Sequence, residues 1–335
     1  MSGLIQNKEG EYFNAAGKGQ LAIVQQLLSD PDVNPNFTEP QYGFTALLYT
    51  CYEGRLSVAA FLLSHPGIDV VKPLANGSTP FYLACEGGHA DIVALMMADP
   101  RIDVTAGRSD QLASPFLVAC QCGHVEVVKL LLADPRVDVM KPQKEGETPF
   151  FAACLAGREG VVELLLADPR VDVNQAENEG NSPFSIACQN GWTSCVSLLI
   201  QDERVDFNCP ADDSCTPLWN AAHHGHLPIV QLVLAHAEGK VDTTSAGWNG
   251  TTPASIARSR KFQHHFGLVP DLSARRDRDG PTIANLIDWY VQDPLEATHS
   301  VRGLPKHRGT ILLAYFLLLL DLRLNTKWTP LNLFS

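Results

Sequence analysis

The 335-residue sequence lacks the motifs that mark common enzyme active sites. It has no phosphate-binding G-x-x-x-x-G-K loop, no G-x-S-x-G nucleophile turn and no zinc-binding H-E-x-x-H. Its longest apolar run, Ile311 to Leu320, has ten residues, against about 20 needed to span a bilayer. The N-terminus has no basic stretch before an apolar core, and Ser2 stands where N-myristoylation needs glycine. We therefore expect a soluble, non-enzymatic protein of the cytoplasm or the nucleus, with no small-molecule substrate.

Positive charge is also scarce over most of the chain. Residues 1–253 hold 14 Lys and Arg against 30 Asp and Glu, a net charge of −16, whereas residues 254–335 hold 11 against 7, a net charge of +4. An acidic body repels phosphate, so we expect no nucleic acid partner. Proteins with basic or mixed surfaces are the better candidates.

What the sequence does have is a repeat of about 34 residues. Glycine recurs in phase from Gly19 to Gly225 at intervals of 34 or 35, and Asp-Pro recurs between Asp30 and Asp168. Proline follows Ser or Thr at Pro80, Pro115, Pro149, Pro183, Pro217 and Pro253. A common period in unrelated residue types indicates stacked copies of one structural unit.

One unit is readable over residues 146–180. Thr148 suits a helix N-cap and Pro149 the first helical position. Apolar side chains from Phe150 to Cys154 predict a short first helix, and Gly157 permits the left-handed conformation that ends it. A second apolar helix over 161–166 stops before Asp168-Pro169. The unit is therefore helix, turn, helix and extended finger.

These units resemble the ankyrin repeat, whose pattern includes T-P-L-H-x-A-A, G-H, V-V-x-L-L-L and D-V-N. Residues 79–97 read TPFYLACEGGHADIVALMM, and residues 114–132 read SPFLVACQCGHVEVVKLLL. The resemblance implies an all-α solenoid with β-turn fingers over residues 11–257, after an extension at 1–10. It would contain a partial unit (11–42), six full units and a fragment at Gly250–Ala257.

The sequence departs from the family pattern at two kinds of position and matches it at a third. The histidine after T-P-L is replaced by Leu48, Tyr82, Leu117, Phe151, Ser185 and Trp219. The finger glycine is replaced by Leu112 and Ser214, so we expect those two turns to be less regular. Asn34, Asn174 and Asn208 match the D-V-N asparagine.

Cysteine and histidine follow the repeat rather than clustering. Cys51, Cys85, Cys120, Cys154 and Cys188 occupy one repeat position, and ligands in a row do not converge on one ion. We interpret them as small buried residues and expect neither a metal nor another cofactor. His89, His124 and His226 hold the family's G-H position, where a structural hydrogen bond is expected.

The resemblance implies a partner-binding groove on the concave face, formed by finger tips and by the exposed ends of the first helices. The aromatic residues of this set are either interface anchors or packing between repeats. The matching residues are Asn76, Tyr82, Lys144, Glu145, Glu147, Phe151, Asn178, Glu179, Asn181, Gln189, Asn190, Asp212, Asp213, Trp219, His223 and His224, with Tyr52, Glu86, Gln121 and Leu155 at equivalent helix ends.

The period is lost after Ala257. Residues 258–280 are basic and turn-rich, which predicts a linker, and 281–335 carry helical patterns. This C-terminal segment is either a cap on the last repeat or a docking element. The leading function is a protein-interaction scaffold or adaptor. The alternatives are a substrate-recognition subunit of a larger enzyme such as a ubiquitin ligase, and a membrane-peripheral adaptor through residues 300–335.

Overall fold

The computed structural model describes residues 8–236 and 240–258, together with residues 284, 287, 288 and 291. Seven helix pairs follow one another along this part of the chain, and we number them repeats 1 to 7. They are α1 (Lys8–Gly17) with α2 (Leu21–Leu28), α3 (Ala46–Tyr52) with α4 (Leu56–Ser64), α5 (Pro80–Glu86) with α6 (Ala90–Met97), α7 (Pro115–Cys122) with α8 (Val125–Leu132), α9 (Pro149–Leu155) with α10 (Glu159–Leu166), α11 (Pro183–Asn190) with α12 (Thr193–Leu199), and α13 (Pro217–His224) with α14 (Leu227–His236). A 3-10 turn (Trp248–Gly250) and α15 (Pro253–Arg258) complete the ordered row.

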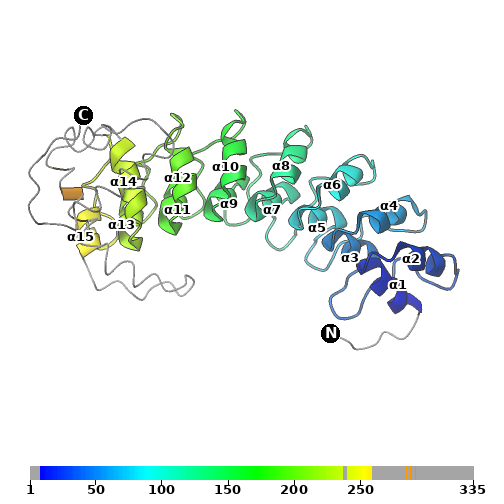
Figure 1. The fold of residues 1–335 in the computed structure, drawn as a ribbon. Coiled ribbons are helices and arrows are strands. Elements are labelled where there is room, and N and C mark those ends of the chain that lie inside the picture. The colour runs from blue at the N-terminus through cyan, green and yellow to red at the C-terminus, as the bar shows by residue number, and fades with distance from the viewer. Residues whose placement is uncertain (1–7, 237–239, 259–283, 285–286, 289–290, 292–335) are drawn as a thin grey trace, which may run out of the picture.

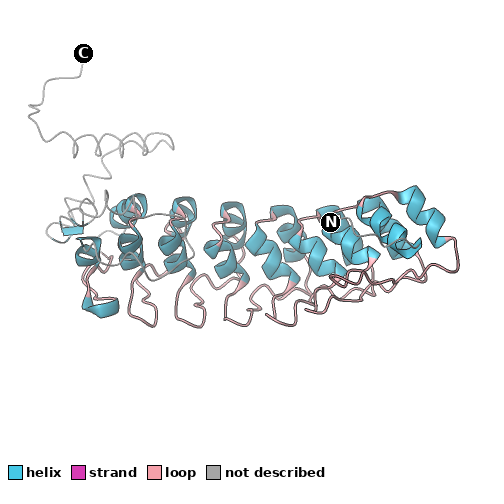
Figure 2. Cartoon of the chain, turned by 90° about the horizontal axis from the view of Figure 1, so that it is seen from below, coloured by secondary structure: helices cyan, strands magenta, loops and turns pink. Residues whose placement is uncertain are grey.

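The repeats form one elongated stack. Each first helix packs on the first helices of its neighbours, and each second helix packs on the second helices beside it. The finger loops project from the same side of the two helix rows (Figure 2). Apart from an isolated bridge between Thr38 and Thr45, the described residues form no strand. The predicted all-α solenoid is therefore confirmed. The predicted partial unit is a complete helix pair, and its first helix begins at Lys8, inside the predicted extension at 1–10.

The start of each first helix is set by its N-cap. Thr148 has an extended backbone, and its hydroxyl accepts a hydrogen bond from the amide of Phe151. This bond satisfies one of the free amides of the helix start. Equivalent bonds of 3.1–3.3 Å are made by Thr45, Thr79, Ser114, Ser182 and Thr216. The helix start keeps its geometry without the family's histidine, because the hydroxyl bonds to the backbone.

A single core runs through the stack. The second residue of the first helix is buried in repeats 2 to 7, as Phe116 and Phe150 illustrate, and so is the row of five in-phase cysteines. Helices of seven to ten residues are too short to be stable alone in water, so each depends on its neighbours for burial. None of the helices among the described residues is long and apolar enough to cross a membrane.

Side chains at the turn between the two helices join neighbouring repeats. His124 donates from Nε2 to the carbonyl of Glu86 at 2.8 Å, and its ring lies so close to Gly88 that a Cβ there would be 2.4 Å from Nδ1. The accepting carbonyl is at a helix C-terminus, where intrahelical donors are absent. The other five junctions have the same contact, which we term the first-helix junction bond, from Arg55, His89, Arg158, Trp192 and His226 at 2.9 Å.

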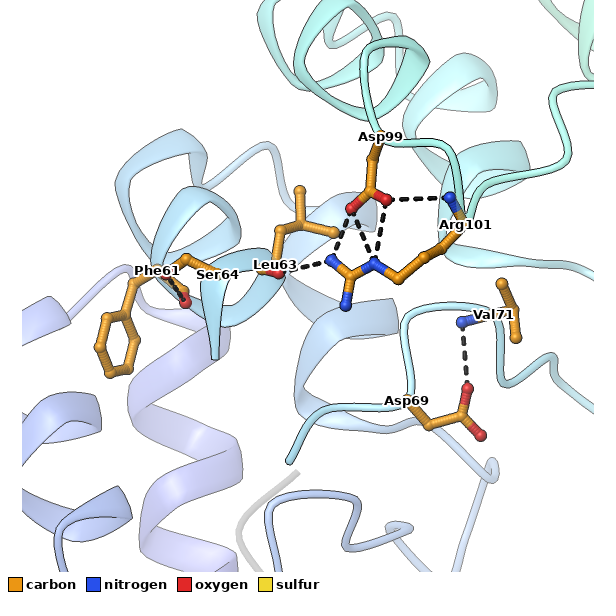
Figure 3. A network of polar contacts seen from close by, with 7 residues as sticks. All are labelled: Phe61, Leu63, Ser64, Asp69, Val71, Asp99 and Arg101. Atoms are coloured by element: carbon orange, nitrogen blue, oxygen red, sulfur yellow. Dashed lines mark hydrogen bonds and ion pairs between the residues drawn. The ribbon is translucent and has the colours of Figure 1, made fainter. Parts of the chain in front are cut away.

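A second contact joins the second helices of neighbouring repeats. Figure 3 shows Arg101 paired with Asp99, two residues earlier, while its guanidinium also donates to the carbonyl of Leu63 at 2.7 Å. The same second-helix junction bond runs from Arg136 to Met97, from Arg170 to Leu132 and from Arg204 to Leu166. The Asp-x-Arg segment, with proline in the middle in three of the four cases, thus follows one helix and places a cation at the C-terminus of the preceding one.

Asparagine side chains link the loops that follow the second helices, both at junctions that lack this arginine and, at Asn174, beside Arg204. The Asn208 amide donates to Lys240 O at 2.7 Å and accepts from Asp242 N at 2.9 Å, and Asn174 does the same with Arg204 and Asp206. In repeat 1 this role belongs to Asn36, which bonds to Gly67 and Asp69. The assignment of Asn34 to this position is therefore wrong, since Asn34 only accepts from the amide of Asn36.

The described positions of the C-terminal segment contact the end of the stack. Ala284 and Ile287 belong to the continuous core, and Asp288 forms an ion pair with Arg258 of α15. These contacts are of the kind expected for a cap. The remainder of the predicted linker (258–280) and helical segment (281–335) lies outside the described residues.

The first-helix junction bond predicts which substitutions His124 accepts. Arg158 makes the same bond one repeat later, so His124→Arg should leave the free energy of unfolding within about 0.5 kcal/mol of the parent. His124→Ala removes the donor and strands the Glu86 carbonyl, which should cost about 1–2 kcal/mol. Urea unfolding of both variants measures the difference, and equal losses would show that packing alone accounts for the residue.

The Asp–Arg pairs predict a loss of stability in acid. The hydrogen bond from Arg136 lowers the pKa of Asp134 below its ordinary value of 3.8. A lowered pKa stabilises the fold above the unfolded-state pKa, and this contribution disappears as pH falls through the folded-state pKa. Asp134→Asn should therefore cost up to about 1 kcal/mol at pH 7 and progressively less as the pH falls through the lowered pKa of Asp134, as measured by urea unfolding from neutral pH into acid. The control is Glu163→Gln, which changes an exposed carboxylate that has no hydrogen bond to a described residue. If the difference in unfolding free energy between the parent and Asp134→Asn stays constant with pH, the Asp134–Arg136 pair is not the source of the acid sensitivity.

Candidate protein-binding face

Adjacent finger tips are tied together by backbone hydrogen bonds. The amide of Lys144 donates to Gln111 O at 2.8 Å, Asn178 to Glu145 O at 3.0 Å, and Asp212 to Glu179 O at 3.1 Å. The amide of Ser109 likewise donates to Asn76 O at 2.9 Å. The fingers of repeats 2 to 6 therefore present their side chains from a fixed, continuous edge rather than from independent loops.

The two fingers that lack the turn glycine behave differently from each other. Ser214 adopts φ 66° and closes the turn with the same i to i−3 bond as Gly146 and Gly180, so the expected irregularity is wrong there. Leu112 adopts φ 59° in a turn that spans one more residue, with Arg108 N bonded to Ala113 O. The irregularity is confirmed in that finger. Both residues have the left-handed backbone conformation that glycine adopts most readily.

We use the term recognition face for the finger tips together with the ends of the first helices. Of the residues predicted for binding, six are exposed: Lys144, Glu145, Asn178, Glu179, Asp212 and Asp213. Seven are half-buried: Asn76, Glu147, Asn181, Gln189, Asn190, His223 and His224. The structure thus brings most of the predicted set to one side of the stack.

The three aromatic members of the predicted set lie inside the stack. Tyr82, Phe151 and Trp219 are only 2–4 % exposed, and the indole of Trp219 donates to Thr251 O at 2.9 Å. Their side chains fill the space between repeats at the position where the family has histidine. The structure therefore removes them from the accessible surface, in favour of the packing alternative.

The finger part of the recognition face is strongly acidic in repeats 4 to 6. Glu145, Glu147, Glu177, Glu179 and the Asp212–Asp213 pair follow one another along the fingers, with Lys141 and Lys144 as the nearby bases. Burial raises the pKa of Glu147, the hydrogen bond from Gln143 lowers it, and the neighbouring Glu177 and Glu145 raise it further. This edge attracts positive charge.

The cysteine and histidine positions take structural roles. The five in-phase cysteines are fully buried free thiols, and burial raises the pKa of each. His223 stacks on Trp219 with ring centroids 4.8 Å apart. Within the described part of the chain, no three His, Cys, Asp or Glu side chains gather in a way that could hold a metal ion.

Sequence reasoning missed two exposed side chains of the recognition face. Leu112 and Tyr42 are at finger tips and are 58 % and 56 % exposed. The available signals were the 35-residue interval between Pro80 and Pro115 and the leucine in place of the turn glycine. Only the tertiary structure decided whether the leucine side chain in this longer turn is buried or exposed.

The left-handed conformation of Leu112 predicts a stabilising substitution. Leu112→Gly relieves strain of about 1–2 kcal/mol, partly offset by the greater freedom of glycine in the unfolded chain, so unfolding should become harder by about 0.5 kcal/mol. Gly146→Ala is the matched opposite: it adds a Cβ at φ 82° only 2.4 Å from Asn178 Oδ1 and should cost more than about 1 kcal/mol. Urea unfolding of both variants tests the pair, and a destabilised Leu112→Gly would show that the side chain packs favourably.

Comparison with known proteins agrees with this architecture. The family model for ankyrin repeats in three copies matches residues 13–108, 107–177 and 159–246. Among solved structures, the ankyrin repeat domain of Bcl-3, a member of the IkappaB protein family, has a TM-score of 0.54 at 23% identity and covers 66% of this chain and 96% of its own. The human ASB11 ankyrin repeat domain has a TM-score of 0.54 at 24% identity and covers 62% and 89%. No curated protein sequence gives a significant match. Because the family model covers well over half of the residues, the chain belongs to the ankyrin repeat family.

Proposed function

We propose that the chain is a non-catalytic scaffold or adaptor that binds another protein on the recognition face. Ankyrin repeats mediate protein–protein interactions, and this supports the general class of function. The observation that carries the proposal here is the hydrogen-bonded finger edge, which presents charged side chains that the stack does not use. A preformed edge reduces the entropy that a partner must lose on binding.

The charge of that edge selects the kind of partner. The carboxylates of Glu145, Glu179 and Asp212 are exposed and form no hydrogen bond with any described side chain or amide. They are thus available to a cationic surface, and residues 1–253 add a long-range attraction through their net charge of −16. A protein with a basic or mixed surface fits best.

The narrower roles depend on the C-terminal region. Recruitment into a larger enzyme such as a ubiquitin ligase, or contact with a membrane through residues 300–335, would add a second attachment to the same binding face. Residues 300–335 lie outside the described part of the chain, so scaffold binding remains the leading proposal. The cytoplasm, or the nucleus, is the expected location.

Charge reversal on the fingers tests the proposal. The full-length triple variant Glu145→Lys, Glu179→Lys and Asp212→Lys should lose at least about 90 % of the partners recovered by tandem affinity purification, because attraction becomes repulsion. Its melting temperature should stay within about 3 °C of the parent, since surface changes away from special features have small effects on stability.

A matched control separates the face from the total charge. Asp32→Lys, Glu163→Lys and Glu203→Lys change the net charge equally at exposed positions away from the finger tips, and should retain the partners. Equal capture by the finger variant, or equal loss in the control, would overturn the assignment of binding to the recognition face.

A further inference from the structure

Two of the fingers are longer than the others and expose apolar side chains. The turns of repeats 1 and 3 are closed by bonds from Glu39 N to Phe44 O and from Arg108 N to Ala113 O. The other fingers close one residue earlier, as Gln143 N to Glu147 O illustrates. Tyr42 and Leu112, at the tips of the longer fingers, are the two most exposed large apolar side chains of the described residues.

The conformation of Leu112 argues that its exposure has a use. A leucine at φ 59° is strained by about 1–2 kcal/mol relative to the ordinary regions, and it buries little surface in return. Glycine occupies the equivalent position in most of the other fingers without that strain. Strain held at an exposed position is a feature of binding sites.

Aromatic rings continue the apolar surface from the repeat 1 finger onto the helix ends. Phe44 is edge-on to Tyr49 and to Tyr52, with ring centroids 6.2 Å apart in each case. Tyr52, the last residue of α3, is nearly half exposed. Exposed aromatic side chains on a rigid base are the typical anchors of protein interfaces.

A half-buried carboxylate ends the helix that packs against the one ending in Tyr52. Glu86 ends α5 as Tyr52 ends α3, so the two occupy the same position in adjacent repeats. Glu86 is half-buried, and its carboxylate forms no hydrogen bond or ion pair with any described residue, whereas its backbone carbonyl accepts the bond from His124. Burial raises its pKa, and Arg108 partly offsets this, but the Arg108 guanidinium is itself paired with Asp110 at 2.6 and 3.0 Å. A desolvated carboxylate in this setting is best satisfied by an incoming cation.

We propose that Tyr42, Tyr52, Glu86 and Leu112 form a docking patch for an extended, basic segment of a partner protein. An aromatic or aliphatic side chain of that segment packs on Tyr52 and on one of the long fingers, while a neighbouring Lys or Arg pairs with Glu86. This refines the proposed function, on which it rests, by naming the partner chemistry. It also divides the recognition face into an apolar end in repeats 1 to 3, at the blue end of the stack in Figure 1, and an acidic end in repeats 4 to 6.

Charge complementarity favours this occupant over a second copy of the chain. Residues 1–253 carry a net charge of −16, so two such bodies repel when their recognition faces approach. A basic segment is attracted by the same field before it reaches the patch.

The test is a selection with random peptides on the full-length chain. A phage-displayed library of random twelve-residue peptides should yield sequences in which an aromatic or aliphatic residue lies within about four positions of Lys or Arg. Fluorescein-labelled copies of these peptides should bind about tenfold more weakly to Glu86→Gln, as expected for loss of a charge-assisted bond, and several-fold more weakly to Leu112→Gly. Replacing the Lys or Arg of the peptide by Gln should weaken binding to the parent chain but not to Glu86→Gln.

Two controls make the outcome specific. Leu56→Ser changes a similarly exposed leucine on α4, away from the fingers, and should alter affinity less than twofold. If the peptides bind Glu86→Gln and Leu112→Gly as tightly as the parent chain, but do not bind the triple finger variant, the docking patch is wrong and the proposed function stands. If the affinity of the peptides is the same for all of these variants as for the parent chain, both the docking patch and the proposed function are wrong.

The remaining occupants are also resolved by experiment. Light scattering that shows a dimer of the parent chain and a monomer of Leu112→Gly would assign the patch to a second copy instead. Displacement of the selected peptides by an equal concentration of a synthetic peptide of residues 258–280 would assign it to the chain's own basic segment. Either result would overturn the proposal.

Discussion

The structure depends on the unsatisfied carbonyls at the C-termini of its short helices. A helix of seven to ten residues leaves up to four carbonyls without an intrahelical donor, a large fraction of its backbone. Here the next repeat provides a donor for one of them at every junction, through an imidazole, a guanidinium or an indole, as His124, Arg158 and Trp192 show. The second helices use Arg101 and its equivalents in the same way. Stability is therefore shared between neighbours, and a single repeat has none of its own.

This dependence explains which residues recur and which vary. The His124 ring that bonds to the preceding helix packs directly over the turn glycine, Gly88. Glycine is needed there both for its left-handed backbone conformation and because a Cβ would collide with the ring. The finger tips join one another mainly through backbone atoms, as the bond from Asn178 N to Glu145 O illustrates, although the Asn178 side chain also donates to Lys144 O. Their side chains are thus free to differ from repeat to repeat, and it is there that the acidic fingers and the exposed Leu112 are found.

Periodicity made most of the fold predictable. A Thr or Ser before proline, as at Thr148-Pro149, predicts a helix start because the cap and the proline act locally, and the predicted cap is present in every full repeat. Departures from the pattern were harder to interpret. Ser214 keeps a regular turn and Leu112 does not, although both replace glycine, because the number of residues in the turn matters more than the identity of one. The buried Tyr82, Phe151 and Trp219 show the same limit, since an aromatic residue near a helix start suits a core and an interface equally well.

The sequence by itself determined the repeat unit and the all-α stack, because caps, turn glycines and apolar periodicity are short-range properties that each unit carries. It also determined the negative charge of the body. Only the tertiary structure decided which side chains remain accessible, because exposure depends on contacts with the neighbouring repeats, 34 residues away. The half-buried carboxylate of Glu86, one repeat on from the exposed ring of Tyr52, and the hydrogen-bonded edge that aligns the fingers exist only once the repeats are stacked.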